Sequence, residues 1–296
     1  MRIEARGVGK RFGRVVALEG VGFEIDAGSR VALVGPNGSG KSTLNRILMG
    51  LLACEGEVRL DGRSPFHERT EIAARMAYVP QTPPQLGARV EEVIGSVARV
   101  RGLSRDAIAH FAREFELELE ALLPRPFRSL SGGTKQKLLI ALAFASRASL
   151  LILDEPTGSL DARARQRFVE RFAAIPSDTT LLLCSHRLEE VRPLVDHVLF
   201  LEEGRLVWQG HAGEFLDRSS LSTVEVWVDG DDAAAWLRAH GFRAGAGGAW
   251  LRSVAHAEKM KLLEEIVREL DGRLGNLNLR DLERIDPSAL HGGIVS

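Results

Sequence analysis

The chain has 296 residues, of which 45% are hydrophobic and 27% are charged, the balance of an ordinary folded protein with one or two cores. Its 39 basic and 40 acidic residues leave a formal net charge of -1. The chain therefore has neither the basic excess that is typical of nucleic-acid-binding proteins nor the acidic block that is typical of a disordered tail. We expect no nucleic acid among the partners.

Three further features of the sequence bear on the compartment of the chain and on whether it spans a membrane. Its longest apolar stretch, residues 138–153, contains Arg147 and is shorter than the about 20 residues of a membrane span. Residues 1–14 lack the apolar core of a signal peptide. Two cysteines, Cys54 and Cys184, are too few for a disulfide framework or a zinc site, and they fit a reducing compartment. We expect a chain that does not cross a bilayer by itself.

Apolar runs and helical patterns alternate over most of the chain. Near the start, Ile3–Lys10 and Val21–Ile25 alternate apolar and polar residues, as the strands of an antiparallel edge do. Later runs are continuously apolar, which is typical of parallel strands covered on both faces. They are Arg30–Val34, Leu150–Leu153 and Thr180–Cys184. The predicted helices are Ser42–Leu52, Arg89–Arg101, Arg105–Phe115, Thr134–Ser146 and Ala162–Ala174. This alternation predicts an α/β domain.

The composition changes at Asp217–Ser222, a polar segment without periodicity that we interpret as a linker. The residues beyond it predict a small α+β unit. Its expected strands are Val224–Val228, Ala249–Val254 and Leu274–Leu279, and its expected helices are Asp231–His240 and Ala257–Asp271. The second helix carries one apolar stripe at spacings of three and four residues. The stripe consists of Met260, Leu263, Ile266, Val267 and Leu270.

A glycine-rich loop follows the apolar run that ends at Val34. Residues 35–43 read GPNGSGKST and match the pattern G-x-x-x-x-G-K-[ST] between a predicted strand and a predicted helix. The glycines allow a tight turn whose N–H groups point inward, and Lys41 and the helix start supply positive charge for phosphates. The Ser42 hydroxyl is a candidate Mg²⁺ ligand. The candidate phosphate-binding residues are Gly35, Pro36, Asn37, Gly38, Ser39, Gly40, Lys41, Ser42 and Thr43.

Two adjacent carboxylates end a second apolar run, which reads LLILDEP from Leu150. At the end of a strand, Asp154 can hold Mg²⁺ through water. Glu155 is then the candidate general base for an attacking water. Alone, such a pair is more often two solvated acids, but the phosphate loop favours the catalytic interpretation.

The segment Leu130–Gln136 reads LSGGTKQ and precedes a predicted helix. With the two motifs above, in this order, it is similar to the ATP-binding subunits of ABC transporters, and the resemblance covers about residues 1–215. It implies an α/β P-loop ABC-type ATPase domain at 1–217, with a helical subdomain at about 82–148, followed by a small accessory domain at 222–296. It also implies a homodimer around two ATP, in which each subunit offers Ser131, Gly132 and Gly133 to its partner's γ-phosphate.

The resemblance extends to single residues. It implies that Phe12 stacks on adenine, that Gln81 contacts Mg²⁺ and the attacking water, and that Asp161 lies at the subunit boundary. His186 resembles the switch histidine that contacts the γ-phosphate. Each residue also has an ordinary structural interpretation: a core aromatic, a solvated glutamine, a helix N-cap or a histidine at a helix start. The chain departs from the common pattern at Thr134 and at residues 157–159, which leaves the catalytic set intact.

The implied function is an ATPase that drives a separate permease from the cytoplasmic face of a membrane. The expected docking segment is 82–101, where prolines and a glycine predict a loop before a helix with an apolar face. That face consists of Val90, Val93, Ile94, Val97 and Val100. The alternation of strand and helix after residue 222 resembles ABC-2-type exporters rather than importers with a barrel-like extension.

Two other classes compete with the transporter. One is an ABC-type ATPase that acts on a non-membrane partner, in translation or DNA repair. Such proteins mostly carry two ATPase modules or a long coiled coil, whereas Lys41 and Ser131 are only 90 positions apart with no heptads between them. The other is a P-loop kinase or GTPase, which the LSGG motif and the later histidine disfavour.

Overall fold

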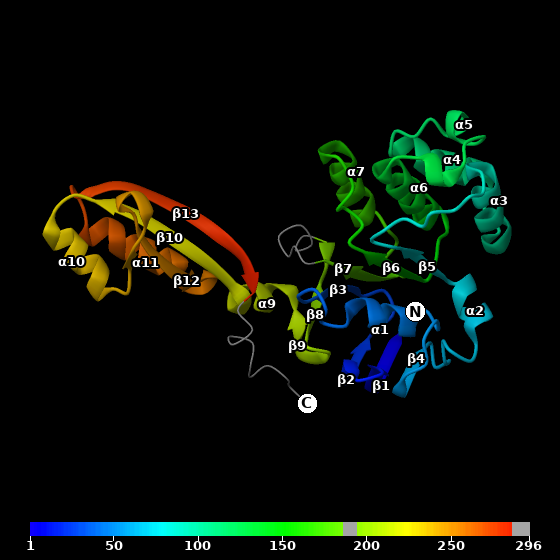
Figure 1. Cartoon of the computed structure of the whole chain (residues 1–296), viewed down its shortest axis with the longest axis horizontal. Coiled ribbons are helices and arrows are strands. Elements are labelled where there is room, and N and C mark those ends of the chain that lie inside the picture. The colour runs from blue at the N-terminus through cyan, green and yellow to red at the C-terminus, as the bar shows by residue number, and fades with distance from the viewer. Residues whose placement is uncertain (186–193, 286–296) are drawn as a thin grey trace. The chain divides into compact units, whose positions relative to one another are not determined.

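The computed structural model describes residues 1–185 and 194–285, and the chain divides into two compact units, Met1–Gln209 and Gly210–Ser296. Each unit has its own sheet and helices (Figure 1). Within the described residues, no helix is both long and apolar enough to span a membrane. Cys54 is half-buried and Cys184 is fully buried, and both are free thiols.

The first unit is built on a six-stranded sheet with the order β5-β6-β7-β3-β8-β9, in which the neighbours from β5 to β8 pair in parallel. The predicted α/β class is therefore confirmed. Every residue of β6 and β7 is buried, which explains why both strands are continuous apolar runs. The strands are β3 (Arg30–Val34), β5 (Met76–Val79), β6 (Leu150–Asp154), β7 (Thr180–Cys184), β8 (His197–Glu202) and β9 (Arg205–His211).

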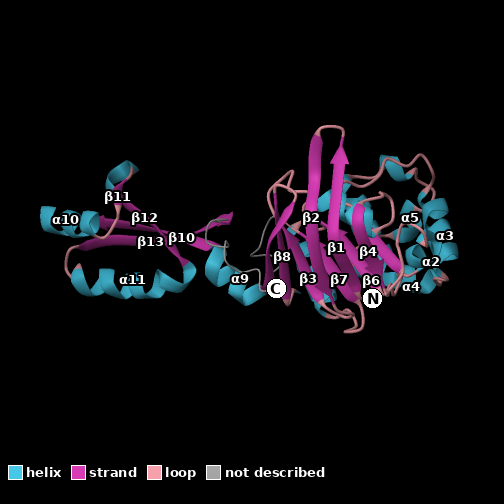
Figure 2. Cartoon of the chain, turned by 90° about the horizontal axis from the view of Figure 1, so that it is seen from below, coloured by secondary structure: helices cyan, strands magenta, loops and turns pink. Residues whose placement is uncertain are grey.

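A smaller antiparallel sheet with the order β2-β1-β4 completes the core of this unit, and β1 and β2 form a long hairpin (Figure 2). Helix α1 (Lys41–Leu48) contributes Leu44, Ile47 and Leu48 to one apolar cluster that includes side chains of both sheets. The helix ends before the predicted Leu52, because Gly50 adopts a left-handed φ of 68°. The strands are β1 (Ile3–Phe12), β2 (Val15–Ile25) and β4 (Glu55–Leu60).

Most helices of the first unit lie between β5 and β6, within the range expected for a helical subdomain. The bounds of α3, α4 and α6 agree with those of the predicted helices to within a few residues, whereas the short α5 was not predicted. Phe144 of α6 is stacked on Phe168 of α7 with ring centroids 5.9 Å apart, and it also contacts Phe115 at the end of α4. Aromatic packing thus ties these helices together. The helices between β5 and β6 are α3 (Val90–Arg101), α4 (Arg105–Glu114), α5 (Leu119–Leu122) and α6 (Gly132–Ala145). Helix α2 (Arg69–Ala74) precedes β5, and α7 (Ala162–Ala173) follows β6.

The second unit has a four-stranded antiparallel sheet with the order β11-β12-β10-β13 and two helices in the connections, which is a split βαβ arrangement. Alternate residues of the central strand β10, Val224 and Val226, pack in one core with Leu237 of α10 and Ile266 of α11. Both helices therefore cover the same face of the sheet. The elements are β10 (Ser220–Val228), α10 (Asp231–Ala239), β11 (Arg243–Ala244), β12 (Trp250–Ala255), α11 (His256–Glu269) and β13 (Leu274–Ile285).

The tryptophans are distributed unevenly. Trp208 is buried in β9 of the first unit, whereas Trp227, Trp236 and Trp250 belong to the second unit. The Trp236 ring is stacked on His240 with centroids 3.7 Å apart, and the Arg238 guanidinium lies 5.3 Å from the centroid of Trp250. Three of the four tryptophans therefore belong to the second unit.

Three expectations about packing were wrong. The expected linker Asp217–Ser222 is the end of helix α9 (Ala212–Ser219) and the start of β10, because pairing with β12 and β13 holds this polar segment in a strand. In α11 the buried face is Leu262, Ile266 and Leu270, so Met260 and Val267 of the predicted stripe are 62% and 57% exposed. On α3, Val100 of the predicted apolar face is 72% exposed, because the helix buries its opposite end at Val90 and Ile94.

Candidate active site

The glycine-rich loop connects the carboxyl end of β3 to the first turn of α1, as the motif predicts. Gly40 stands immediately before the helix with φ 106°, and a Cβ atom there would lie 2.6 Å from the carbonyl oxygen of Ala17. A Cβ at Gly35 would collide with the carbonyl oxygen of Leu201. The turn therefore requires glycine at both positions. Because Gly40 has no side chain to cap α1, the first N–H groups of the helix stay available for an anion.

Lys41 is buried at this loop. Its Nζ atom donates hydrogen bonds to the carbonyl oxygens of Gly35 at 2.6 Å and Pro36 at 3.0 Å. Burial lowers the pKa of Lys41, partly offset by the neighbouring acidic groups. The ammonium group is thus held inside the loop, close to the backbone that the motif uses to bind phosphates. The loop, the buried ammonium group and the uncapped start of α1 together suit the phosphate groups of a nucleoside triphosphate.

The acidic pair lies at the carboxyl end of β6. In the sheet, only β7 separates β6 from β3, the strand that precedes the phosphate loop. Asp154 is buried, and the Tyr78 hydroxyl donates to its Oδ2 atom at 3.4 Å. Burial raises the pKa of the Asp154 carboxyl, because the charged form is poorly solvated. Asn45 of α1 donates to the Sγ atom of Cys184 at 3.1 Å beside it. A carboxylate in this position is suited to hold a cation.

Glu155 has an unusual backbone. Its φ is 47°, in the left-handed region that residues other than glycine rarely adopt, and its N–H donates to the carbonyl oxygen of Cys184 at 2.9 Å. Strain of this kind persists only where the surrounding structure fixes the backbone, and it is concentrated at functional sites. The turn directs the chain away from the sheet immediately after Asp154.

The LSGG motif forms the start of α6. Ser131 is the N-cap, and its Oγ atom accepts a hydrogen bond from the Thr134 N–H at 3.1 Å. A Cβ atom at Gly132 would meet no atom within 4 Å, whereas a Cβ atom at Gly133 would lie 3.0 Å from the carbonyl oxygen of Ser159. Ser131 and Gly132 are exposed. The N-terminus of α6 is therefore open to solvent in a single chain.

The remaining predicted residues lie around these motifs. Gln81 is exposed in the loop after β5, and Asp161 caps α7 while its carboxylate pairs with Lys137 at 2.8 Å. Phe12 is 46% exposed near the end of β1, so it is not a core aromatic. His186 lies outside the described residues. Three residues that form hydrogen bonds at or next to these motifs had no predicted role. They are Tyr78, Asn45 and Gln136. Their only sequence signal is a polar group within an apolar segment.

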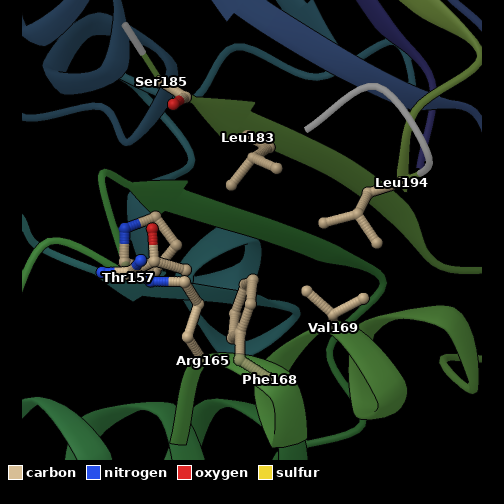
Figure 3. Close-up of a pocket in the computed structure, with 8 residues that line it drawn as sticks. Thr157, Arg165, Phe168, Val169, Leu183, Ser185 and Leu194 are labelled. Carbon is tan, nitrogen blue, oxygen red and sulfur yellow. The ribbon is translucent and has the colours of Figure 1, made fainter. Parts of the chain in front are cut away.

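A small cavity of about 110 Å³ lies beyond Pro156, between α7 and β7 (Figure 3). Its walls are largely apolar, and its volume is far below the about 300–1,000 Å³ of typical ligand sites. It is therefore not the nucleotide site. The lining residues are Pro156, Thr157, Arg165, Phe168, Val169, Leu183, Ser185 and Leu194.

Comparison with known proteins places this site in a family. A family model described as ABC transporter matches residues 18–158. The Nod factor export ATP-binding protein I of Cupriavidus metallidurans is 33% identical over 240 residues, covering 77% of each chain. The phosphate import ATP-binding protein PstB of Pyrobaculum aerophilum is 30% identical, over 77% of this chain and 98% of that protein. A solved ATP-binding subunit of an ABC transporter superposes with a TM-score of 0.66 at 29% identity, covering 73% of this chain and 92% of that one.

The chain belongs to the ABC transporter family, as an ATP-binding subunit. Its relatives bind ATP, and members of this class are ATPases that work with a membrane subunit. The relatives include both export and import proteins, so membership alone does not fix the direction of transport.

Proposed function

We propose that this chain hydrolyses Mg·ATP as a homodimer and drives export through a separate permease. The observation that carries the proposal is that the Lys41 loop and the pair Asp154 and Glu155 follow the carboxyl ends of β3 and β6, two parallel strands that flank β7, and that both carboxylates act electrostatically on Lys41. Export is supported by the second unit, whose described residues form an open antiparallel sheet with helices rather than a barrel. The same proposal places the chain at the cytoplasmic face of a membrane.

In this proposal the chain's own groups divide the work. The loop from Gly35 to Thr43 and the start of α1 bind the phosphates, and Lys41 neutralises the charge that develops on the transferred phosphoryl group. Glu155 accepts the proton of the attacking water. Gln81 and His186 orient that water and contact the γ-phosphate. Phe12 is exposed enough for its ring to stack on the adenine base.

Mg²⁺ would be held by the Ser42 hydroxyl, by Gln81 and, through water, by Asp154, and it would neutralise phosphate charge. These few protein ligands suit Mg²⁺, which keeps several waters and binds mainly through substrate phosphates. Among the described residues, no cluster of three or more His, Cys, Asp or Glu side chains offers a complete metal cage. The chain therefore supplies part of a shell that the nucleotide completes.

The open N-terminus of α6 supports the homodimer. Helix N-termini bind anions, and the Gly132 and Gly133 N–H groups stand at one that is exposed. A second chain that brings a nucleotide to this surface would provide the anion. Asp161 then lies at the boundary between subunits, held by its ion pair with Lys137.

Light scattering tests the dimer. In the presence of Mg·ATP, Glu155→Gln should form dimers, because the phosphate contacts remain while hydrolysis is slowed. The matched control is Glu155→Gln with Ser131→Arg, in which a large side chain fills the α6 N-terminus and should leave the protein monomeric. A Glu155→Gln protein that stays monomeric in saturating Mg·ATP would overturn the two-subunit site.

For the permease, we propose docking at residues 82–101 and the groove beside them. This groove, of about 350 Å³, lies between β5, α3 and α6, and its walls are mainly apolar. Val97, Val100 and Leu142 are among its lining residues. The exposed Val100 stands at a site suited to the apolar face of a short helix from the permease.

Crosslinking tests this docking surface. A cysteine at Leu86 or Ala88, in a chain without Cys54 and Cys184, should crosslink to the co-purified permease, with a yield that differs between ATP-bound and nucleotide-free states. A cysteine at Met260, which is also exposed but lies in the second unit, is the control. Crosslinks at position 260 alone would show that docking was misplaced. A partner captured that is not a membrane protein would favour an ABC-type ATPase of the non-membrane class.

A further inference from the structure

Gln136 occupies an unusual position for an amide side chain. It is fully buried on α6, a helix whose following residues are nearly all apolar. Its Nε2 atom donates to two carbonyl oxygens, those of Pro80 and Pro156, each at 3.3 Å. An amide nitrogen has two hydrogens, so both bonds form at once.

The two acceptors stand next to the reacting groups. Pro80 immediately precedes Gln81 on the loop after β5, and Pro156 immediately follows Glu155 at the end of β6. One side chain therefore joins the backbone of the loop that carries the proposed water-contacting glutamine to the backbone of the turn that carries the proposed base. The two segments are far apart in sequence and otherwise belong to different elements.

Stability alone does not account for a glutamine here. Its Oε1 atom is buried and has no hydrogen-bond partner among the described residues. An unsatisfied buried acceptor is destabilising, and an apolar side chain of similar length would avoid it. The Glu155 backbone, in contrast, adopts a left-handed φ that neighbouring contacts must hold. The bond to the Pro156 carbonyl is such a contact.

The neighbours of Gln136 reach farther along the same two loops. Lys135 is buried and donates to the Gln85 side chain at 3.1 Å, and Lys137 pairs with Asp161 at 2.8 Å. Three successive residues, each on a different side of the helix, thus contact the loop after β5 and the segment after Glu155. This turn of α6 begins only two residues after the LSGG motif.

We infer that Gln136 is a positioning residue for ATP hydrolysis, which fixes Gln81 and Glu155 relative to each other through the Pro80 and Pro156 carbonyls. The inference rests on the roles proposed above for these two residues. Gln136 is fully buried and bonds to the carbonyls of Pro80 and Pro156, not to the phosphate loop, so we expect it to act on the rate of the chemical step and not on nucleotide binding.

Three variants of the full chain test this role. Gln136→Met keeps the length of the side chain and removes both donors, so kcat should fall by about 10²-fold, the effect of misplacing reacting groups by about 1 Å. The nucleotide Kd should change less than about threefold, because the phosphate loop is untouched. Leu138→Met, a volume-conserving change at a buried position of the same helix, should keep kcat within about threefold.

Gln136→Glu separates positioning from mere packing. An ionised carboxylate repels the two carbonyls, but a protonated one donates a hydrogen bond to one of them. Burial raises the pKa of a carboxyl, so kcat relative to the unmodified chain should recover as the pH is lowered from 8 to 6. Gln136→Met should show no such recovery. In a Glu155→Gln background, Gln136→Met should cause little further loss, because it acts through Glu155.

The outcomes distinguish this inference from the proposed function. If the unmodified chain does not hydrolyse ATP, the proposed function fails. If it does, and Gln136→Met retains its kcat, the positioning role fails. A pH-independent Gln136→Glu, or loss of the native circular dichroism spectrum in both variants, would make Gln136 a structural residue and also overturn the inference.

Discussion

The cores of the two units contain different kinds of buried side chain. The described core of the second unit is apolar, formed by residues such as Val226, Leu237 and Ile266. The first unit also buries polar and charged groups, and most of them gather near the phosphate loop, the end of β6 and the start of α6. These groups include Ser39, Lys41, Asn45, Lys135, Gln136, Asp154 and Ser185.

This difference indicates which part of the first unit contains residues that stability alone does not explain. A buried polar group lowers stability unless its hydrogen bonds are complete, and Ser39 Oγ and Asn45 Oδ1 have no partner among the described residues. The second unit shows no such groups within its described part. We therefore expect changes to the polar core to alter chemistry, and loss of the second unit to leave the chemistry of nucleotide binding intact.

The largest expected effect comes from the acidic pair. Glu155→Gln should lower kcat by about 10²–10⁴-fold, the usual contribution of a general base, while nucleotide affinity stays near that of the unmodified chain. Phosphate release and equilibrium binding measured on the same protein separate the two quantities. Unchanged turnover would remove Glu155 from its proposed role.

A change at Lys41 should show the opposite pattern. Lys41→Ala removes a charged donor from the phosphate loop, and nucleotide affinity should fall by about 10–100-fold, which corresponds to one or two charge-assisted hydrogen bonds. Titration with a fluorescent nucleotide measures the change, and Lys137→Ala, which removes a lysine that pairs with Asp161, is the control. Equal losses in both variants would argue against a special role for the loop lysine.

A smaller effect should appear in stability. Burial raises the pKa of Asp154, so the ionised carboxylate destabilises the fold at neutral pH. Asp154→Asn should raise the free energy of unfolding by about 0.5–2 kcal/mol at pH 7, as removal of a functional strain commonly does. As the pH falls through the raised pKa, the native carboxyl takes up a proton and the unmodified chain gains stability, so the difference should shrink. Denaturant titrations at several pH values measure it, and a constant difference would contradict the assignment.

The smallest effect is expected from removing the second unit. A chain of residues 1–209 should bind nucleotide with an affinity within about threefold of that of the full chain. A chain of residues 1–221 keeps α9 without β12 and α11, which exposes Ala212 and Phe215 and should cause aggregation. Sedimentation and nucleotide titration compare the two. If the shorter chain is folded but no longer binds nucleotide, the two units are not independent in this respect.

The sequence predicts most of the first unit because burial on both faces leaves a local signal. β3 and β7 have the predicted bounds, and β8, which contains the apolar residues Val198–Leu201, carries the same signal although it was not predicted. β4 could not be recognised in this way, since among its six residues only Val58 and Leu60 are buried and its pairing with β1 defines it. The expected linker at Asp217–Ser222 was wrong for the same reason.

In the candidate site, too, some features leave a local signal in the sequence and others depend on contacts between distant residues. Each of its motifs is contiguous in sequence, so the phosphate loop, the acidic pair and the LSGG segment can be recognised from the order of residues alone. The contacts of Asn45 with Cys184, of Tyr78 with Asp154 and of Gln136 with Pro80 join residues that are 139, 76 and 56 positions apart. Only the folded chain brings such pairs together, and so their roles could not be predicted.

The uneven distribution of tryptophan gives the two units separate optical signals. Because three of the four indoles belong to the second unit, intrinsic emission mainly monitors that unit during heating or denaturant titration. Binding of a fluorescent nucleotide monitors the first. Recording both in one cuvette would resolve whether the units unfold in one transition or two, without any label on the protein. A melting curve of this chain that is recorded from tryptophan emission alone would therefore describe mainly the smaller unit.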